Sequence, residues 1–253
     1  MRIVYLVGTA GSGKSSLAAA YSEWLKSNEQ IVATVNLDPA AAVLPYEPDI
    51  DIREYVDFER IMLTRQLGPN AALISSFREA VREVEDLAED VEALGADYVV
   101  VDTPGQLELF AFRKEGRELV KIFRKFPSVL VYLLDPVTSH TTRLFTASLF
   151  LTTSVYFSLA LQTIIAISKV DAVPKRILKR IKRWIESREA LEVDIESKGG
   201  GMQMLITRDL VGIMHEIGRM FPVVMVSSMK MLGLGALHAE VTKMVGEGEY
   251  ELR

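Results

Sequence analysis

The sequence predicts an α/β protein with a mostly parallel β-sheet covered by helices on both faces. Short runs rich in Val, Ile, Leu and Tyr recur along the 253 residues, and each is nearly continuous rather than alternating. Continuous runs are typical of strands that are buried on both faces. Helical patterns separate the runs, which is typical of a doubly wound parallel sheet. We expect one domain, residues 1–253, with helical insertions at about 41–95 and 172–220.

Six strands and eight helices follow from these patterns. The strands are predicted at Ile3–Val7, Ile31–Asn36, Tyr98–Val101, Ser128–Leu134, Thr163–Ile167 and Val223–Val226. The helices are predicted at Ser15–Ser27, Arg53–Gln66, Asn70–Leu94, Leu107–Lys125, Thr142–Leu161, Lys175–Glu189, Ile206–Met220 and Ala236–Val245.

Composition excludes several classes of protein. The net charge of −5 argues against direct nucleic-acid binding through a broad basic surface. The chain has no cysteine, which excludes disulfides and Cys-ligated metals. The uncharged stretch 144–168 is long enough to span a bilayer, but Ser, Thr and Gln interrupt it and its last part is β-branched. We therefore expect a cytoplasmic protein without a membrane segment.

The nine residues after the first predicted strand, GTAGSGKSS, match the phosphate-binding pattern G-x-x-x-x-G-K-[ST]. Gly8, Gly13, Lys14 and Ser15 occupy its fixed positions. The glycines let backbone N–H groups converge on a β-phosphate at the positive end of the next helix. Lys14 reaches the β- and γ-phosphates, and the Ser15 hydroxyl ligates Mg²⁺. The remaining residues predicted to line the nucleotide here are Ala10, Gly11, Ser12 and Ser16.

A second motif follows the third predicted strand, which ends in DTPGQ. Asp102 at the end of a buried strand can reach Mg²⁺ through its water shell, which is the Walker B role. The N–H of Gly105 is free to meet a γ-phosphate, and Gln106 is placed to orient the attacking water.

A third element, NLDPA, follows the second predicted strand and corresponds in position to the first switch of nucleotide-dependent switch proteins. Asp38 is a candidate for holding a Mg²⁺-bound water or polarising the nucleophile. Asp-Pro is equally a common way to open a turn.

The choice of base is predicted from Ser168-Lys169-Val170-Asp171 after the fifth strand. The Asp171 carboxylate can accept from guanine N1–H and the exocyclic amino group, and the Lys169 stem can lie along the purine. GTPases usually carry Asn or Thr where this chain has Ser168, which puts the tie between this loop and the P-loop in question. Ser227 and Ser228, after the last strand, resemble the weaker motif that meets guanine O6.

Together, GTAGSGKSS, LDPA, GPN, DTPGQ, SKVD and VSS, in this order, closely resemble the GPN-loop GTPases. These are archaeal and eukaryotic nucleotide switches related to signal-recognition and MinD-type P-loop proteins. The resemblance covers essentially the whole chain. It implies a P-loop α/β domain with extra helices and an archaeal-type homodimer that binds GTP or GDP and Mg²⁺.

The resemblance also gives Gly68-Pro69-Asn70 a function across the dimer, as a loop that reaches the nucleotide of the partner subunit. MinD-type relatives use an early P-loop lysine for this purpose, and residues 8–13 contain none. Asn70 takes that place by resemblance. Asn offers a donor and an acceptor, and Pro69 fixes its own φ. Because Asn cannot neutralise charge as an Arg finger does, we expect slow turnover, as in a switch.

The resulting hypothesis is a Mg²⁺-dependent GTPase switch that drives assembly or disassembly of a protein complex. Eukaryotic family members are linked to assembly and nuclear import of RNA polymerase II, and a similar role here is an extrapolation. One alternative is a P-loop kinase with Lys175–Arg188 as its lid, although an exposed basic helix face is the preferred interpretation of that segment. Another is a nucleotide-gated binding module in which Gln106 and Asn70 only report the nucleotide state.

Overall fold

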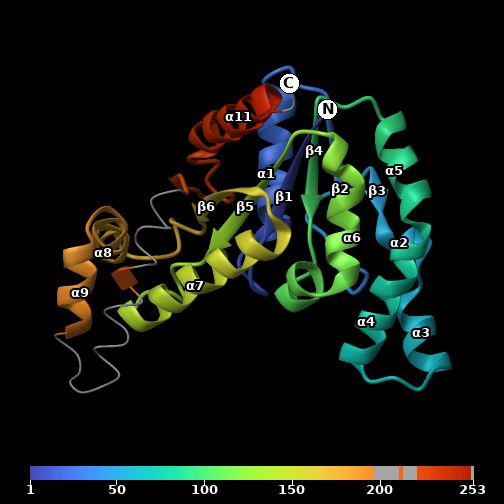
Figure 1. Cartoon of the computed structure of the whole chain (residues 1–253), viewed down its shortest axis with the longest axis horizontal. Helices are drawn as coiled ribbons and strands as arrows, with labels where there is room; N and C mark the ends of the chain where they lie inside the picture. The colour runs from blue at the N-terminus through green and yellow to red at the C-terminus, as the bar shows by residue number, and fades with distance from the viewer. Residues whose placement is uncertain (197–210, 213–220, 252–253) are drawn as a thin grey trace.

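The computed structural model describes residues 1–196, 211–212 and 221–251. Its centre is a seven-stranded sheet in the order β3-β2-β4-β1-β5-β6-β7, and all neighbouring strands are parallel. Figure 1 shows the sheet between two layers of helices, with both termini at the edge where the strands begin. The strands are β1 (Arg2–Val7), β2 (Val32–Asn36), β3 (Ile50–Asp51), β4 (Tyr98–Asp102), β5 (Ser128–Leu134), β6 (Gln162–Ile167) and β7 (Val223–Met225). The predicted fold class is confirmed.

All six predicted strands form, with ends that shift by one residue at most. The strand β3 was not predicted, because two residues that run directly into α2 carry too short an apolar signal to be recognised. It pairs with the end of β2 and forms the sheet edge.

The core lies on both faces of the sheet. Ile3, Tyr5 and Val7 of β1 belong to one buried cluster, and Val4 and Leu6 belong to another. This split follows from the alternation of side chains along a strand. The helices α1 (Lys14–Ser27) and α11 (Leu234–Glu251) cover the second face, while α4 (Pro69–Ala80), α5 (Val84–Ala93), α6 (Lys114–Ile122) and α7 (Thr142–Leu159) contribute to the first.

The predicted helix Arg53–Gln66 is instead two helices, α2 (Ile52–Tyr55) and α3 (Phe58–Thr64). They separate because Val56 is extended and the Asp57 carboxylate accepts from the N–H of Arg60 at 2.8 Å, which caps a new helix. The predicted helix Asn70–Leu94 likewise divides into α4 and α5 through a 3₁₀ turn at Val81–Glu83. No Gly or Pro marks that break; both halves turn their apolar residues into the same cluster.

Two other predicted helices also differ in detail, and a third lies almost entirely outside the described residues. Leu107–Lys125 contains a π-helical turn, Glu108–Phe112, an extended Arg113, then α6 and a 3₁₀ turn, Phe123–Lys125. Lys175–Glu189 divides into α8 (Lys175–Glu186) and α9 (Arg188–Glu196), because the Ser187 hydroxyl accepts from the N–H of Ala190 and starts the second helix. The predicted helix Ile206–Met220 lies, apart from residues 211–212, outside the described residues.

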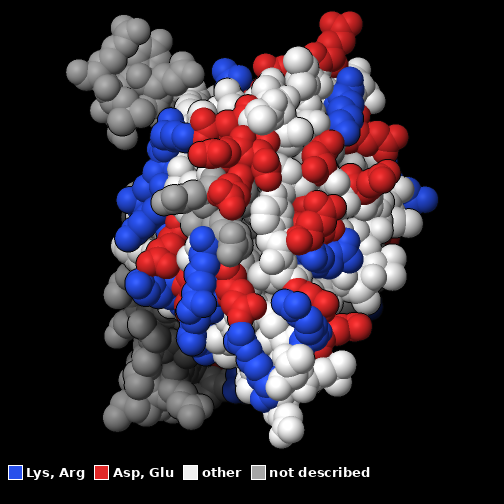
Figure 2. Space-filling view, turned by 90° about the vertical axis from the view of Figure 1, so that its right-hand side faces the viewer, with Lys and Arg blue, Asp and Glu red and all other residues white. Residues whose placement is uncertain are grey.

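The chain between β2 and β4 forms one side of the molecule. Figure 2 shows this side, with acidic side chains gathered over its upper part and an uncharged tip at its lower end. The acidic residues include Asp86, Glu89, Asp90 and Glu92 of α5. The tip is the turn between α3 and α4, and residues 67–72 there carry no charge.

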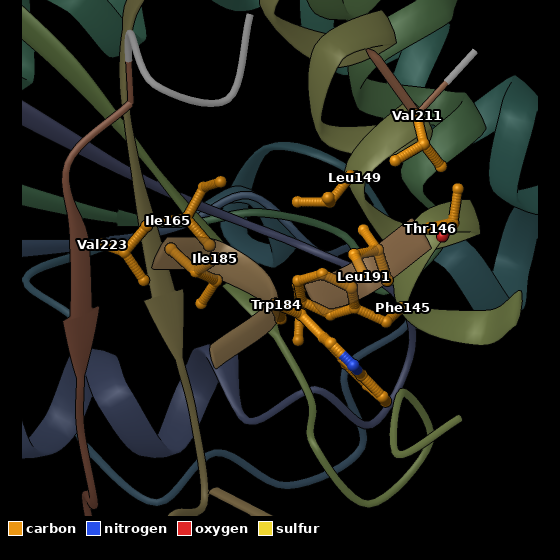
Figure 3. Close-up of a pocket in the computed structure, with 10 residues that line it drawn as sticks. Phe145, Thr146, Leu149, Ile165, Trp184, Ile185, Leu191, Val211 and Val223 are labelled. Carbon is orange, nitrogen blue, oxygen red and sulfur yellow. The ribbon is translucent and has the colours of Figure 1, made fainter. Parts of the chain in front are cut away.

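The uncharged stretch 144–168 divides into α7 and β6, as predicted. Phe145, Ile165 and Ile167 of this stretch enter a third core cluster. In it, Phe145 of α7 lies against Trp184 of α8 with ring centroids 5.3 Å apart. Figure 3 shows these rings together with Leu191 and Ile185 around a small apolar pocket. Among the described residues, no helix is both long and apolar enough to cross a membrane.

Candidate nucleotide-binding site

The phosphate-binding loop connects β1 to α1 at the carboxyl edge of the sheet. Gly13 has a φ of 98° and Gly11 a φ of 74°, in the left-handed region that glycine adopts without steric penalty. A Cβ on Gly8 would lie 2.7 Å from Ser12 Oγ and 2.9 Å from the carbonyl oxygen of Leu133. The motif glycines are therefore required by the backbone of this loop.

Lys14 folds back over this loop. Its Nζ donates to the carbonyl oxygens of Gly8 and Thr9, each at 3.3 Å. Burial lowers the pKa of Lys14, while the carboxylates of Asp102 and Asp38 raise it. The ammonium group is thus held at the loop whose N–H groups are expected to meet phosphate. Ser15 and Ser16 follow it in the first turn of α1.

Asp102 ends β4 beside Leu6 of β1, so the sheet register brings it next to the P-loop. It is 1% exposed. Burial raises its pKa to about 6, against the hydrogen bonds from Ser15 and Tyr46 and the charge of Lys14. A carboxylate held in this way is ready for a cation that completes its environment.

The residues present fit a Mg²⁺ ion that arrives with its nucleotide. Oδ1 of Asp102 is buried and has no hydrogen-bond partner, and the Ser15 hydroxyl lies beside the same carboxylate. Among the described residues no group of three or more His, Cys, Asp and Glu is placed to hold a metal. One hydroxyl and one or two carboxylates, supplemented by phosphate oxygens and water, are the ligand set Mg²⁺ takes in nucleotide sites.

The two predicted switch segments meet at Asp38. Its Oδ2 accepts from the N–H of Gly105 at 3.3 Å, and its Oδ1 accepts from the N–H of Ala40 at 3.0 Å. The N–H of Gly105 was predicted to be free, but here Asp38 occupies it because the two carboxyl strand ends are close. A Cβ on Gly105 would be 3.6 Å from Ala10 of the P-loop. The following residue, Gln106, is exposed.

The Ser168 hydroxyl ties the predicted base-reading loop to the P-loop. Ser168 Oγ donates to the carbonyl oxygen of Ser12 at 2.8 Å, so serine makes the tie that its replacement of Asn had put in question. Lys169 crosses the P-loop as well: its Nζ donates to the carbonyl oxygen of Gly11 and pairs with Asp135 at 2.8 Å.

Asp171 is exposed and its Oδ1 accepts from the Ser227 hydroxyl at 2.5 Å. That hydrogen bond lowers the pKa of Asp171, which keeps the carboxylate charged as an acceptor. Ser227 Oγ also accepts from the N–H of Lys230, and Ser228 lies in the same turn. Two loops thus hold one exposed carboxylate acceptor between them.

Gly68-Pro69-Asn70 lies away from these residues. Gly68 precedes α4, Pro69 is its first residue, and all three are exposed. Figure 1 shows the α3–α4 turn beyond the carboxyl edge of the sheet, at the side of the molecule. A Cβ on Gly68 would have no heavy atom within 4 Å. The turn is therefore open to another molecule.

Comparison with known proteins identifies the family to which this set of motifs belongs. A family model described as "Conserved hypothetical ATP binding protein" matches residues 6–247. A GPN-loop GTPase of Pyrococcus abyssi is 33% identical over 218 residues, which cover 85% of this chain and 86% of its own. The chain belongs to the GPN-loop GTPase family. The crystal structure of a Pyrococcus abyssi GTPase in apo form matches at a TM-score of 0.87 and 31% identity, covering 96% of this chain and 97% of that chain.

GPN-loop GTPase 1 of Dictyostelium discoideum is 30% identical over 217 residues, covering 84% of this chain and 54% of its own length. The present chain thus spans about half the length of the Dictyostelium protein. The description of the family model mentions ATP, whereas the curated relatives are named GTPases. The choice between ATP and GTP depends on the residues predicted to meet the base, which include Asp171 and Ser227.

Two further residues of this GPN-loop protein belong to the site and were missed from the sequence. Tyr46 donates to Asp102 at 3.2 Å, although PYEPD looks like turn punctuation. Asp135, which directly follows the buried strand β5, pairs with Lys169. Its position after an apolar strand was a usable signal; Tyr46 offered none.

A chain of polar contacts supports the segment around Asp38. The Asp38 N–H donates to Asn36 Oδ1, and Asn36 Nδ2 donates to Asp51 Oδ1. The Arg53 guanidinium donates to both carboxylate oxygens of Asp51 and, at 2.8 Å, to the carbonyl oxygen of Ala41. Burial acts to raise the pKa of Asp51, but the hydrogen bonds from Arg53 and Asn36 outweigh it and lower the pKa. The short strand β3 thus positions the residues on both sides of Asp38.

Proposed function

We propose that this chain is a Mg²⁺-dependent switch that binds and hydrolyses GTP and works as a homodimer. The observation that carries the proposal is the link from base to phosphate: Asp171 is held by Ser227, and its loop is tied to the P-loop through Ser168. An acceptor carboxylate at this place suits guanine, which presents two donors on its Watson–Crick edge.

The phosphate residues have separate roles in this proposal. Lys14 leaves the carbonyl oxygens of its own loop and pairs with the phosphates. Ser15, Asp102 and Asp38 hold Mg²⁺ directly or through water, and the bound ion supplies charge stabilisation to the phosphates. Gly105 exchanges Asp38 for a phosphate oxygen, which gives the segment a nucleotide-dependent position. Gln106, exposed beside it, orients the attacking water.

The hydrolytic site is proposed to be completed by the partner subunit. The tip formed by Gly68, Pro69 and Asn70 is uncharged, exposed and directed beyond the sheet edge that carries the P-loop. Pro69 at the first helical position fixes the backbone from which Asn70 projects. In a homodimer the Asn70 amide of one subunit reaches the phosphates or the water of the other.

Assembly or disassembly of a protein complex is the proposed cellular role. Loops that exchange contacts with the nucleotide state are suited to controlling a protein partner, and extension of this role to RNA polymerase is an extrapolation. A cytoplasmic location, without direct nucleic-acid or membrane binding, belongs to the same proposal.

The alternative of a P-loop kinase has less support. A kinase lid needs arginines that are free to close on phosphates. In α8, Arg183 pairs with Asp194, and Arg180 lies over the Trp184 ring and donates to the carbonyl oxygen of His140. These contacts suit an exposed basic face that is held in place.

Hydrolysis of GTP and ATP, each with and without Mg²⁺, tests the proposal. We expect GTP-specific, Mg²⁺-dependent release of phosphate. Asp171→Asn should lose GTP and gain XTP, because xanthine offers an acceptor where guanine offers its amino group. Equal use of ATP and GTP by the native chain would contradict the guanine assignment, and phosphate transfer to a small acceptor in place of water would favour the kinase.

A further inference from the structure

The segment after the first switch reaches the magnesium-binding carboxylate through one side chain. The Tyr46 hydroxyl donates to Oδ2 of Asp102 at 3.2 Å. Tyr46 lies in residues 39–49, between Asp38 and β3, and this segment carries the 87% exposed Val43. A segment with many exposed residues thus places a hydroxyl on the most buried acid of the site.

The direction of this hydroxyl is informative. The Tyr46 ring packs against the core cluster of α1 and also lines an open groove with Ser22 and Lys26. A tyrosine beside an open groove can direct its hydroxyl to water while its ring remains packed. Here the hydroxyl points inward, to a carboxylate that is 1% exposed. Packing alone does not require this orientation.

The hydrogen bond leaves Asp102 with an unequal pair of oxygens. Oδ2 accepts from Tyr46, whereas Oδ1 is buried without a partner. A buried oxygen without a partner is unfavourable unless a ligand meets it. The Tyr46 hydroxyl, as the donor to Oδ2, fixes which way the carboxylate turns.

We propose that Tyr46 is a positioning residue for Mg²⁺. Its hydroxyl holds the Asp102 carboxylate so that Oδ1 remains for the water shell of the ion. This inference rests on the proposed function, because it requires the Mg²⁺–nucleotide complex to bind at Asp102.

The same contact couples the metal to the first-switch segment. Residues on both sides of Tyr46 are anchored. Before it, the carbonyl oxygen of Ala41 accepts from Arg53; after it, the Asp49 carboxylate accepts from the N–H of Thr34 at 2.7 Å. Between these anchors, Tyr46 joins the segment to Asp102. If the placement of the segment changes metal affinity, the metal must in turn stabilise that placement, because binding linkage is reciprocal.

The test is Tyr46→Phe, which keeps the ring and removes the hydroxyl. Mn²⁺ binding to the GDP complex, followed by electron paramagnetic resonance, reports metal affinity without turnover. We expect the Mn²⁺ dissociation constant to rise about tenfold, the effect of one hydrogen bond to a charged group. GDP affinity in excess EDTA should be unchanged. Hydrogen exchange of residues 39–49 should slow on Mg²⁺ addition in the native complex and much less in the variant.

Tyr55→Phe is the matched control. Tyr55 also donates to a carboxylate, Asp90, but on the outer side of the molecule. It should leave Mn²⁺ affinity unchanged, and thermal melts of both variants verify folding. If a folded Tyr46→Phe protein binds Mn²⁺ as tightly as the native chain, the inference is overturned. A loss of GDP affinity in EDTA as large as the loss of Mn²⁺ affinity would also overturn it, because the hydroxyl would then act on the nucleotide.

The outcome for the inference is separable from that for the proposed function. If the native GDP complex binds Mn²⁺ and hydrolysis of GTP needs the metal, the proposed function stands whatever Tyr46→Phe does. If the native complex does not bind the metal, the proposed function and this inference both fail.

Discussion

The phosphate-binding part of the sheet edge and the α3–α4 turn differ in whether their residues find partners within one chain. In the former, Lys14, Asp102 and Gly105 all have partners within the chain, and these partners come from the P-loop and from the loop between β2 and β3. In the latter, Gly68-Pro69-Asn70 is exposed, at a helix start that points past the sheet.

This contrast indicates a division of labour. Within the proposed function, a buried network that is already connected is suited to bind phosphate and metal without large rearrangement, since its groups are held by the fold. An exposed, uncharged turn stiffened by proline gains a defined position when another surface meets it. Within the proposed function, binding belongs to a single chain and hydrolysis to a pair of chains.

The largest effect should come from Lys14→Ala, which removes the cation from the connected half. GTP affinity should fall about 100-fold, because hydrogen bonds from a charged group to phosphate are lost. Fluorescent-nucleotide titration measures the loss. Lys26→Ala, an exposed lysine of the same helix, is the control and should bind normally. A small effect of Lys14→Ala would show that the loop amides alone hold the phosphates.

The connected half should also make the nucleotide-free protein sensitive to pH. Burial raises the pKa of Asp102 from 3.8 to about 6, so the folded state binds a proton more tightly than the unfolded state. Its contribution to the free energy of unfolding therefore increases as pH falls from about 6 to 4, on the order of 2 kcal/mol. Chemical unfolding of the native chain and of Asp102→Asn, each at pH 7 and at pH 4.5, measures this contribution. From pH 7 to 4.5, the free energy of unfolding of the native chain should rise relative to that of the variant. A constant difference would contradict the buried, ionised carboxylate.

Asn70→Ala tests the exposed turn alone. GTP affinity should stay nearly intact while hydrolysis falls about tenfold, as for the loss of one transition-state hydrogen bond. Single-turnover hydrolysis at saturating GTP separates the two quantities. Asn28→Ala, at the end of α1, is a matched asparagine control. Unchanged hydrolysis in Asn70→Ala would remove the turn from catalysis.

The smallest effect should come from Ser168→Ala, which cuts the tie between the base loop and the P-loop. GTP affinity should fall about fivefold, as for one neutral hydrogen bond. Ser168→Asn, with the amide usual at this position, should restore it. A variant without the hydroxyl that binds GTP as well as the native chain would show that the tie does not organise the base loop.

Much of the fold could be predicted because its strands are continuous apolar runs and its nucleotide motifs sit at their carboxyl ends. Ser15, Asp38, Asp102 and Gly105 come together because β1, β2 and β4 are neighbours. The helix break at Val56–Asp57 could not be predicted, because an Asp cap within a helical pattern looks like an ordinary polar residue. Tyr46 was missed for another reason: its partner is 56 residues away, and such contacts leave no local pattern.

The most direct test of the central claim is complementation between two chains whose GTP hydrolysis is impaired in different ways. Lys14→Ala and Asn70→Ala proteins are purified separately, mixed, and assayed for GTP hydrolysis. In a mixed dimer, the subunit with an intact Lys14 faces a partner with an intact Asn70. Activity on mixing well above the sum of the separate proteins is the predicted result. No gain, with mixed dimers verified by mass spectrometry, would contradict the account and return the Asn70 turn to its own chain.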